Sequence, residues 1–311
     1  MPRLTSKVAH SHAARDRIKT ERPLRALVTG ASSGIGREFA MFLAERGHDV
    51  VLVARREAML HELASHIMAS HPVKATVIAQ DLSDPDASAT LVAELERQGL
   101  EIDVLINNAG ATMDGHYLLH PWEQHRAYQQ LMCLTPAELT YRLLPGMLRR
   151  GFGQVVNVAS IAGLIPSSPF NSLYGPCKTH LVVLTRTLQL EYGGAGVTFS
   201  ACCPGPVADT PILNESAHGQ SWARFPFLLS NPRRLVEKAY AAVEKGRTVQ
   251  PVGPLARAVT VQNRLLPART SNWVSGATVM FMSDEKRITS AAEAGLEPHT
   301  QESRRMDANH S

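Results

Sequence analysis

The stretch LRALVTGASSGIG, residues 24–36, decides the fold of this chain. Its apolar first half predicts a short buried strand over residues 24–29, and a helix follows from about Gly34. Gly30, Gly34 and Gly36 lie between this strand and this helix in the spacing G-x-x-x-G-x-G. Glycine lets a backbone turn tightly and approach a pyrophosphate, and the helix N-terminus offers free N–H groups and a positive dipole end. In this position the turn predicts a dinucleotide-binding unit.

Strands and helices alternate through the rest of the chain. The segment DVVLVA (49–54) is apolar throughout, which is typical of a parallel strand covered on both faces. We expect further strands at 74–79, 104–106, 154–158 and 197–202, and helices at 34–46, 56–70, 84–98, 122–149 and 174–192. Pro145 predicts a kink or an early stop in the fourth of these helices. The alternation predicts an α/β fold with a Rossmann-like, doubly wound parallel β-sheet flanked by helices, a three-layer α/β/α sandwich.

The two ends of the chain differ in composition from its centre. Residues 1–25 carry seven Lys or Arg against two acidic residues, about +5, whereas the whole chain carries +4. We favour a basic, disordered leader over residues 1–23 rather than a contact with acidic surfaces, and a polar, disordered tail over 283–311. No repeat or linker divides residues 24–282, which we expect to form one domain. No run of apolar residues reaches membrane-spanning length, and no nucleic-acid-binding signature occurs.

Cysteine and histidine usage favours neither disulfides nor a metal site. The four cysteines contain no C-x-x-C pair and no disulfide-framework spacing, which fits a reducing, cytoplasmic location. Three of the thirteen histidines cluster at His116, His120 and His125, but no H-E-x-x-H or Cys/His ligand pattern accompanies them. We therefore predict no metal, and we expect these histidines to be solvated on loop and helix surfaces.

A second group of motifs carries the chemistry. Tyr174 and Lys178 are four residues apart, so they lie on one face of a predicted helix. There the ammonium can lower the phenol pKa from about 10, which suits Tyr174 to donate a proton. Ser160 lies fourteen residues upstream, after the predicted strand 154–158, at the edge where open α/β sheets bind ligands. The turn Asn-Asn-Ala-Gly (107–110) falls between the glycine turn and this serine.

In this order the motifs resemble those of the short-chain dehydrogenase/reductase family of the Y-x-x-x-K type, over about residues 24–250. The resemblance implies that Ser160 hydrogen-bonds the substrate carbonyl or hydroxyl. It implies that Tyr174 donates the proton in reduction and accepts it in oxidation. It also implies that Lys178 holds the nicotinamide ribose and lowers the pKa of the tyrosine. A hydride would pass between the nicotinamide and a carbonyl carbon, so the protein positions groups and the cofactor carries the redox chemistry.

The end of the second strand indicates which cofactor binds. NAD enzymes usually carry an acidic residue there, whereas this chain has Arg55 and Arg56. Guanidinium groups suit a ribose 2′-phosphate, which favours NADP(H); the alternative is that both arginines begin the next helix and face water. The resemblance adds cofactor contacts around the three glycines, at the strand ends and beside the nicotinamide: Ser32, Ser33, Ile35, Asp81, Leu82, Asn108, Ala109, Gly110, Pro204, Gly205 and Val207. Thr210 is left out because Asp209 separates it from the expected position.

One residue of the family pattern is missing. The family usually has an asparagine on the long helix, where it holds a water that links the lysine to solvent. An ungapped count from Gly110 to Leu-Pro-Gly-Met (144–147) puts Met132 at this position. A thioether sulfur accepts hydrogen bonds only weakly. The alternative to an NADP(H)-dependent oxidoreductase is therefore a non-catalytic NADP(H)-binding sensor or scaffold protein. Cys177, beside Lys178, is either a low-pKa thiol or a buried, inert one.

The segments around the expected substrate site are apolar. Residues 209–230 include Leu213, Trp222, Phe225, Phe227, Leu228 and Leu229. These side chains suggest a bulky hydrophobic carbonyl compound or alcohol as substrate; the equally weighted alternative is that they only close the edge of the core. Residues 255–282 mix arginines with apolar positions. We expect a helix packed on the domain or on a second subunit rather than a membrane-surface patch. The resemblance implies a homodimer or homotetramer.

Overall fold

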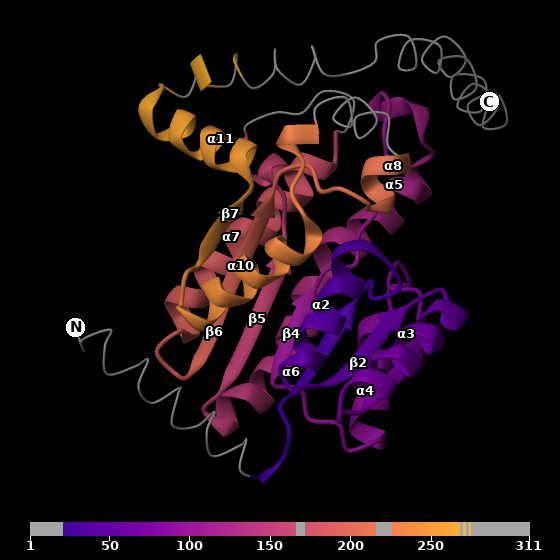
Figure 1. Cartoon of the computed structure of the whole chain (residues 1–311). Coiled ribbons are helices and arrows are strands. Elements are labelled where there is room, and N and C mark those ends of the chain that lie inside the picture. The colour runs from indigo at the N-terminus through magenta and orange to yellow at the C-terminus, as the bar shows by residue number, and fades with distance from the viewer. Residues whose placement is uncertain (1–20, 166–171, 216–225, 268–269, 272–273, 275–311) are drawn as a thin grey trace, which may run out of the picture.

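The computed structural model describes residues 21–165, 172–215, 226–267, 270–271 and 274. The expected leader, apart from residues 21–23, and the expected tail lie outside the described residues. In the described part, the fold is the predicted Rossmann-like α/β/α sandwich (Figure 1).

A parallel β-sheet of seven strands forms the middle layer, in the order β3-β2-β1-β4-β5-β6-β7. Its strands are β1 (Arg25–Thr29), β2 (Asp49–Ala54), β3 (Ala75–Ala79), β4 (Val104–Asn107), β5 (Gly153–Val158), β6 (Val197–Pro204) and β7 (Val249–Val252). All strand pairs run parallel. The first six strands were predicted within two residues, because they are apolar on both faces. The order reverses between β1 and β4, and open α/β sheets bind ligands at the carboxyl ends of strands at such a point.

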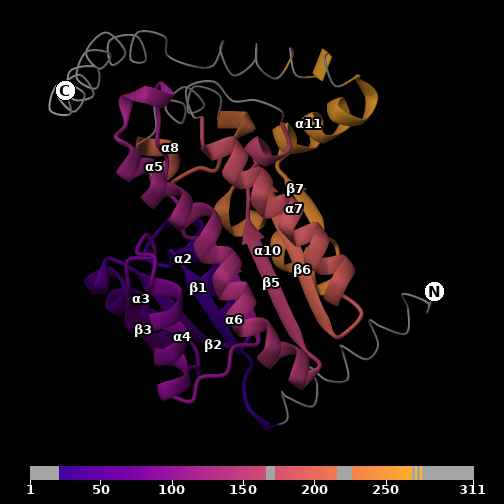
Figure 2. The ribbon, with the colours of Figure 1, turned by 180° about the vertical axis from the view of Figure 1, so that it is seen from behind.

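Helices cover both faces of the sheet (Figures 1 and 2). The described helices are α2 (Gly34–Glu45), α3 (Glu57–Ser70), α4 (Ala87–Arg97), α5 (Trp122–Gln129), α6 (Thr135–Arg150), α7 (Tyr174–Tyr192), α8 (Pro211–Glu215), α10 (Pro232–Glu244) and α11 (Pro254–Leu265). The helices α2, α3 and α10 pack on one face of the sheet, and α4, α6 and α7 pack on the other. Among the described residues, no helix has the length and hydropathy needed to cross a membrane.

The predicted helix over 122–149 differs from the expectation. It divides into α5 and α6, which a π-helical turn over Gln130–Leu134 joins. The early stop that Pro145 predicted does not occur, because α6 continues to Arg150. Leu144 and Met147 on either side are buried, and this packing offsets the backbone hydrogen bond that proline cannot make.

The last described elements complete the sheet and cap one end of it. The strand β7 pairs with β6 at the sheet edge, and α11 packs against β7. Ala256 of α11 is fully buried, so the expected packing of the C-terminal helix on the domain holds for the described residues 254–265. The remainder of the segment 255–282 is described only at residues 266–267, 270–271 and 274.

Candidate active site

A cavity of about 820 Å³ opens at the carboxyl ends of the strands. Its wall runs from the glycine turn after β1 to helix α11. Every residue that the sequence predicted for catalysis or cofactor binding lines this cavity, apart from Gly36. Residues that are more than 200 positions apart in the sequence therefore share one cavity.

The glycine turn is held tightly against the end of β4. Gly30 has a φ of 67°, and a Cβ built there would lie 2.8 Å from Nδ2 of Asn108. Gly36 lies beneath the turn, where a Cβ would lie 2.3 Å from the carbonyl oxygen of Gly30. Nδ2 of Asn108 donates to the carbonyl oxygen of Thr29 over 2.9 Å. The turn has room for backbone only, and it leaves the N-terminus of α2 beside the cavity, so it fits a pyrophosphate.

Two guanidinium groups lie at the same end of the cavity. Nη2 of Arg56 donates to Oγ of Ser32 over 3.0 Å and to Oγ of Ser33 over 2.7 Å. The side chain of Arg55 is 74% exposed, and its Nη1 lies 3.9 Å from Oδ2 of Asp81. Arg56 thus points back to the glycine turn instead of facing water alone. This corner concentrates positive charge and hydroxyl groups, which fits a phosphate on the ribose.

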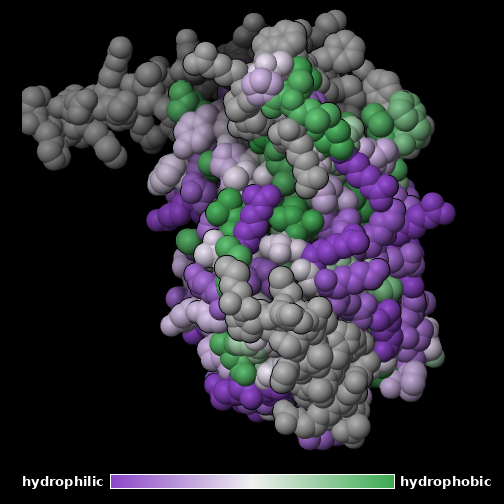
Figure 3. All heavy atoms as spheres, turned by 90° about the vertical axis from the view of Figure 1, so that its left-hand side faces the viewer, coloured by the Kyte–Doolittle hydropathy of each residue, from purple (hydrophilic) through white to green (hydrophobic). Residues whose placement is uncertain are grey.

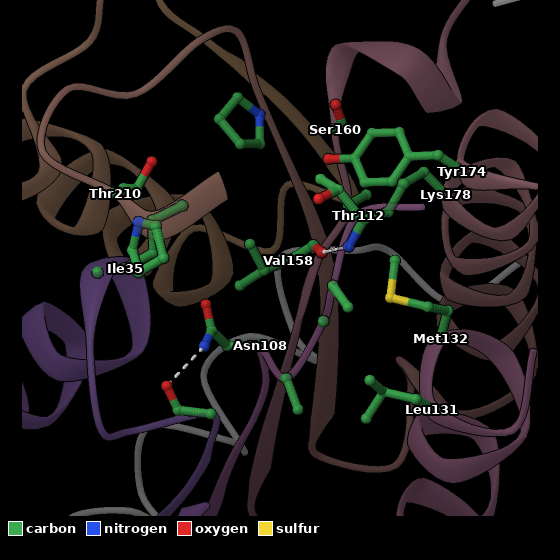
Figure 4. A pocket seen from close by; sticks show the side chains of 18 of the residues that line it. Ile35, Asn108, Thr112, Leu131, Met132, Val158, Ser160, Tyr174, Lys178 and Thr210 are labelled. Atoms are coloured by element: carbon green, nitrogen blue, oxygen red, sulfur yellow. Dashed lines mark hydrogen bonds between the residues drawn. The ribbon is translucent and has the colours of Figure 1, made fainter. Parts of the chain in front are cut away.

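Ser160, Tyr174 and Lys178 come together at the other end of the cavity (Figure 4). Ser160 follows β5, and its Oγ accepts from the backbone N–H of Ala162 over 3.1 Å. The hydroxyl groups of Ser160 and Tyr174 lie side by side (Figure 4). Nζ of Lys178 donates to the carbonyl oxygen of Val158 over 2.8 Å and lies 5.6 Å from the centre of the Tyr174 ring. Two hydroxyl groups therefore face the cavity, with a buried ammonium behind them.

Burial shifts the pKa values of both ionisable groups here. It raises the pKa of Tyr174 above its ordinary value of 10, and the charge of Asp114 adds to this increase. The neighbouring hydroxyl of Ser160 acts in the opposite direction. Burial also lowers the pKa of Lys178 to about 8, although neighbouring thiols oppose this shift. The direction for Tyr174 is opposite to the expected lowering by Lys178. The reason is that desolvation of the phenol is the largest contribution, and Nζ of Lys178 bonds a backbone carbonyl rather than the phenol.

The ungapped count had placed Met132 beside the lysine, and Met132 does line the cavity wall (Figure 4). It lies in the π-helical turn and is 1% exposed. It packs in one apolar cluster with Tyr128, Cys177 and the ring of Tyr174. A thioether thus occupies a buried position beside the tyrosine and lysine.

Sequence reasoning missed several parts of the cavity wall. Thr210 is buried in it, and its Oγ1 donates to the carbonyl oxygen of Val207 over 3.0 Å. Asp209 has a φ of 55°, and this left-handed residue turns the chain so that Thr210 reaches the wall one residue later than the family pattern has it. Helix α11 adds Leu255, Ala258, Val259 and Gln262. No motif marks α11, although its apolar spacing at 255 and 259 is that of one helix face.

The histidine prediction was wrong for His125. This residue is buried, and its Nε2 lies 2.8 Å from the carbonyl oxygen of Tyr117. Its ring packs against the Tyr117 ring with centroids 4.5 Å apart. His125 is buried because its ring supplies a hydrogen-bond donor to the carbonyl oxygen of Tyr117. Within the described part of the chain, no group of three or more His, Cys, Asp or Glu side chains is placed to hold a metal ion.

The predicted substrate segment is only partly described. Leu213 lines the cavity, whereas Phe227 is exposed. Leu228 and Leu229 are half-buried and do not line the cavity, and Trp222 and Phe225 lie outside the described residues.

Comparisons with known proteins agree with this architecture. The model of a family described as short chain dehydrogenase matches residues 25–221. Ketoacyl reductase HetN of Nostoc sp. is 36% identical over 184 residues, which cover 59% of this chain and 63% of HetN. A 7beta-hydroxysteroid dehydrogenase of Collinsella aerofaciens is 29% identical over 223 residues, covering 72% of this chain and 84% of that protein. The chain thus spans less than two thirds of the length of HetN.

Solved structures match as well. A short-chain dehydrogenase from Sphingobium yanoikuyae, in complex with NADPH, aligns with a TM-score of 0.68 and 28% identity. The alignment covers 78% of this chain and 93% of that protein.

Proposed function

We propose that this chain, which belongs to the short-chain dehydrogenase family, is an oxidoreductase that moves a hydride between NADP(H) and a carbonyl or secondary alcohol. One observation carries the proposal. The neighbouring hydroxyls of Ser160 and Tyr174, backed by Lys178, lie in the same cavity as the paired arginines. The proposed proton donor and the proposed phosphate site thus lie at opposite ends of one cavity.

Tyr174 is the general acid of reduction and the base of oxidation. Its raised pKa keeps the phenol protonated at neutral pH, so the free protein is ready to donate a proton. The hydroxyl of Ser160 lies beside the phenol hydroxyl and is positioned to bind the same substrate oxygen. As negative charge develops on that oxygen, two hydroxyl donors stabilise it within a largely buried site.

Lys178 supplies positive charge behind the phenol. Its Nζ bonds the carbonyl oxygen of Val158, which fixes the ammonium near the Tyr174 ring. This charge favours the phenolate that forms after proton transfer. Lys178 also lines the cavity, where it would hold the nicotinamide ribose.

When bound, the nicotinamide cofactor supplies or accepts the hydride. The glycine turn would bind the pyrophosphate, and Arg55 and Arg56 the 2′-phosphate of NADP(H). The substrate side of the cavity is lined by apolar residues, which favours a hydrophobic small molecule: Met113, Leu131, Leu213, Leu255 and Val259. The similarity to a protein named 7beta-hydroxysteroid dehydrogenase supports a bulky apolar substrate.

NADPH consumption against a panel of ketones and aldehydes tests the proposal. The panel should include bulky aromatic and polycyclic ketones beside small polar ones. We expect turnover of at least one bulky member and none of the small polar ones. Tight NADPH binding with no turnover of any carbonyl or alcohol would contradict the proposal.

The lowered pKa of Lys178 predicts a pH dependence. The ammonium is present below its pKa of about 8 and is lost as pH rises through it. We expect kcat/KM for NADPH to be constant near pH 6–7 and to fall about tenfold per pH unit above about 8. A profile that stays flat to pH 10 would contradict the role of the Lys178 charge.

A second candidate function rests on Met132. The family resemblance puts a water-holding asparagine at this position, and a buried thioether cannot hold that water well. A protein that binds NADP(H) without turning over a substrate is therefore the alternative, and it would act as a sensor or scaffold.

Met132→Asn distinguishes the two functions. We expect a hydride-transfer rate equal to or above that of the unmodified protein, because an amide can hold the relay water. Stability should fall by about 1–3 kcal/mol, because a buried amide lacks partners. Single-turnover kinetics and thermal unfolding measure both. Leu131→Asn, which alters the neighbouring lining residue, is the matched control and should only slow the reaction. If neither the unmodified protein nor Met132→Asn turns over a substrate, the sensor or scaffold function is favoured.

We further propose that the protein is a homodimer or homotetramer in the cytoplasm. Exposed apolar side chains recur seven residues apart, so they lie on one helix face: Leu134 with Tyr141, and Val183 with Leu190. Tyr141 belongs to α6, and Val183 and Leu190 belong to α7. These two helices cover the same face of the sheet (Figure 2). Light scattering should give a dimer or tetramer mass, and Val183→Glu with Leu190→Glu should give a monomer. A monomeric unmodified protein would contradict this.

Helix α11 also exposes Val261 and Leu265. In the coloured part of the face in Figure 3, hydrophobic side chains gather at the end of the molecule that carries α11. We favour a subunit contact over a membrane contact here, because α11 is already held to the domain through Ala256.

A further inference from the structure

Two cysteines from distant parts of the chain meet behind the catalytic residues. Cys133 lies in the π-helical turn, and Cys177 lies in the first turn of α7, between Tyr174 and Lys178. Both belong to the apolar cluster of Met132, in which the π-helical turn packs against the first turn of α7. Neither lines the cavity. Two cysteines at the contact between packed elements can be joined by a disulfide when their sulfurs approach to bonding distance.

The two thiols differ in access and in acidity. Cys133 is half-buried, whereas Cys177 is 2% exposed. The neighbouring Cys177 lowers the pKa of Cys133, and the charge of Lys178 acts in the same direction. The neighbouring Cys133, together with burial, raises the pKa of the Cys177 thiol. Cys133 is therefore the attacking sulfur, and Cys177 is the resolving one.

The other two cysteines have no such properties. Cys202 and Cys203 lie side by side on β6 and are fully buried. Burial raises the pKa of both thiols. They are inert toward oxidants and serve as internal controls.

We propose that Cys133 and Cys177 form a dithiol modification site that a low-molecular-weight disulfide, such as glutathione disulfide, converts to an internal disulfide. The thiolate of Cys133 attacks one sulfur of the reagent, and the other sulfur leaves as a thiolate. The thiolate of Cys177 then attacks the sulfur of Cys133, and the second reagent thiolate leaves. The two protons from the cysteines go to the leaving thiolates, so the reagent is reduced to two thiols.

The disulfide changes the site that the proposed function uses, and this part of the inference rests on that function. The sulfurs must approach to about 2.05 Å, which pulls the first turn of α7 toward the π-helical turn. Tyr174 and Lys178 lie on that turn. Oxidation should therefore stop proton transfer.

The test uses the full-length protein, first reduced and then treated with glutathione disulfide. We expect peptide mapping to find Cys133 linked to Cys177, with the intact mass reduced by two hydrogens. Turnover with NADPH should fall about tenfold or more, because displacements near 1 Å can cost about 100-fold. Dithiothreitol should restore it. Cys133→Ser should keep full activity and resist the treatment, whereas Cys202→Ala should remain sensitive.

The outcomes separate this inference from the proposed function. Peptide mapping by mass spectrometry detects the disulfide even if the protein turns over no substrate. In that case, weaker NADPH binding after oxidation replaces turnover as the functional readout. Absence of a Cys133–Cys177 link would overturn the site. If the disulfide forms completely but turnover and NADPH binding stay unchanged, the proposed effect of the disulfide on the active site is wrong. The same conclusion follows if glutathione disulfide inactivates Cys133→Ser as fast as the unmodified protein.

Discussion

Tyr174→Phe should lower turnover of a good carbonyl substrate by about 100-fold or more, while NADPH binding stays within about twofold. The substitution removes only the hydroxyl beside that of Ser160, and it keeps the ring that packs beside Met132 and Cys177. The loss therefore falls on proton transfer and not on the shape of the cavity. Steady-state kinetics with NADPH and cofactor fluorescence titration measure the two quantities.

Tyr128→Phe is the matched control for this prediction. Tyr128 also lines the cavity, but its hydroxyl donates to the carbonyl oxygen of Ala111 over 3.1 Å. Its loss should cost about 0.5–1.5 kcal/mol of stability and leave turnover within about fivefold. Near-normal turnover by Tyr174→Phe, or equal inactivation by both variants, would mean that Tyr174 is not the proton donor.

The parts of the fold that could be predicted are those whose signal is local. The segment 49–54 is apolar throughout because both faces of the strand are covered, and the structure has the strand at these residues. The glycine turn needs backbone-only contacts at Gly30 and Gly36, which no other residue type permits. Motif spacing then identified cavity residues along the whole sheet edge.

The missed parts depend on tertiary context. The edge strand β7 contains Pro251 and is half-buried, so it has neither the continuous apolar run nor the composition of a central strand. The π-helical turn is one local change of register, which sequence spacing does not reveal. The pKa of Tyr174 depends on how deeply the phenol is buried, so the spacing to Lys178 gave the wrong direction.

The unmodified protein should bind NADPH at least about tenfold more tightly than NADH, a difference of about 1.4 kcal/mol or more. Replacing both Arg55 and Arg56 with alanine should remove most of this difference. A charge-assisted hydrogen bond is worth about 1.5–3 kcal/mol, so one guanidinium contact with the phosphate is sufficient to produce the preference. Equal affinity of the unmodified protein for the two cofactors would contradict the prediction.

The single variants separate the two arginines. Arg56 is already tied to the hydroxyls of Ser32 and Ser33, so Arg56→Ala should weaken NADPH binding and also loosen the glycine turn, with a smaller loss for NADH. Arg55 is exposed and holds only a long ion pair with Asp81, so Arg55→Ala should affect NADPH alone. Arg37 does not line the cavity, and Arg37→Ala should change neither affinity by more than about twofold. If Arg37→Ala erased the preference and Arg55→Ala left it intact, the 2′-phosphate would bind along α2 and not at the end of β2.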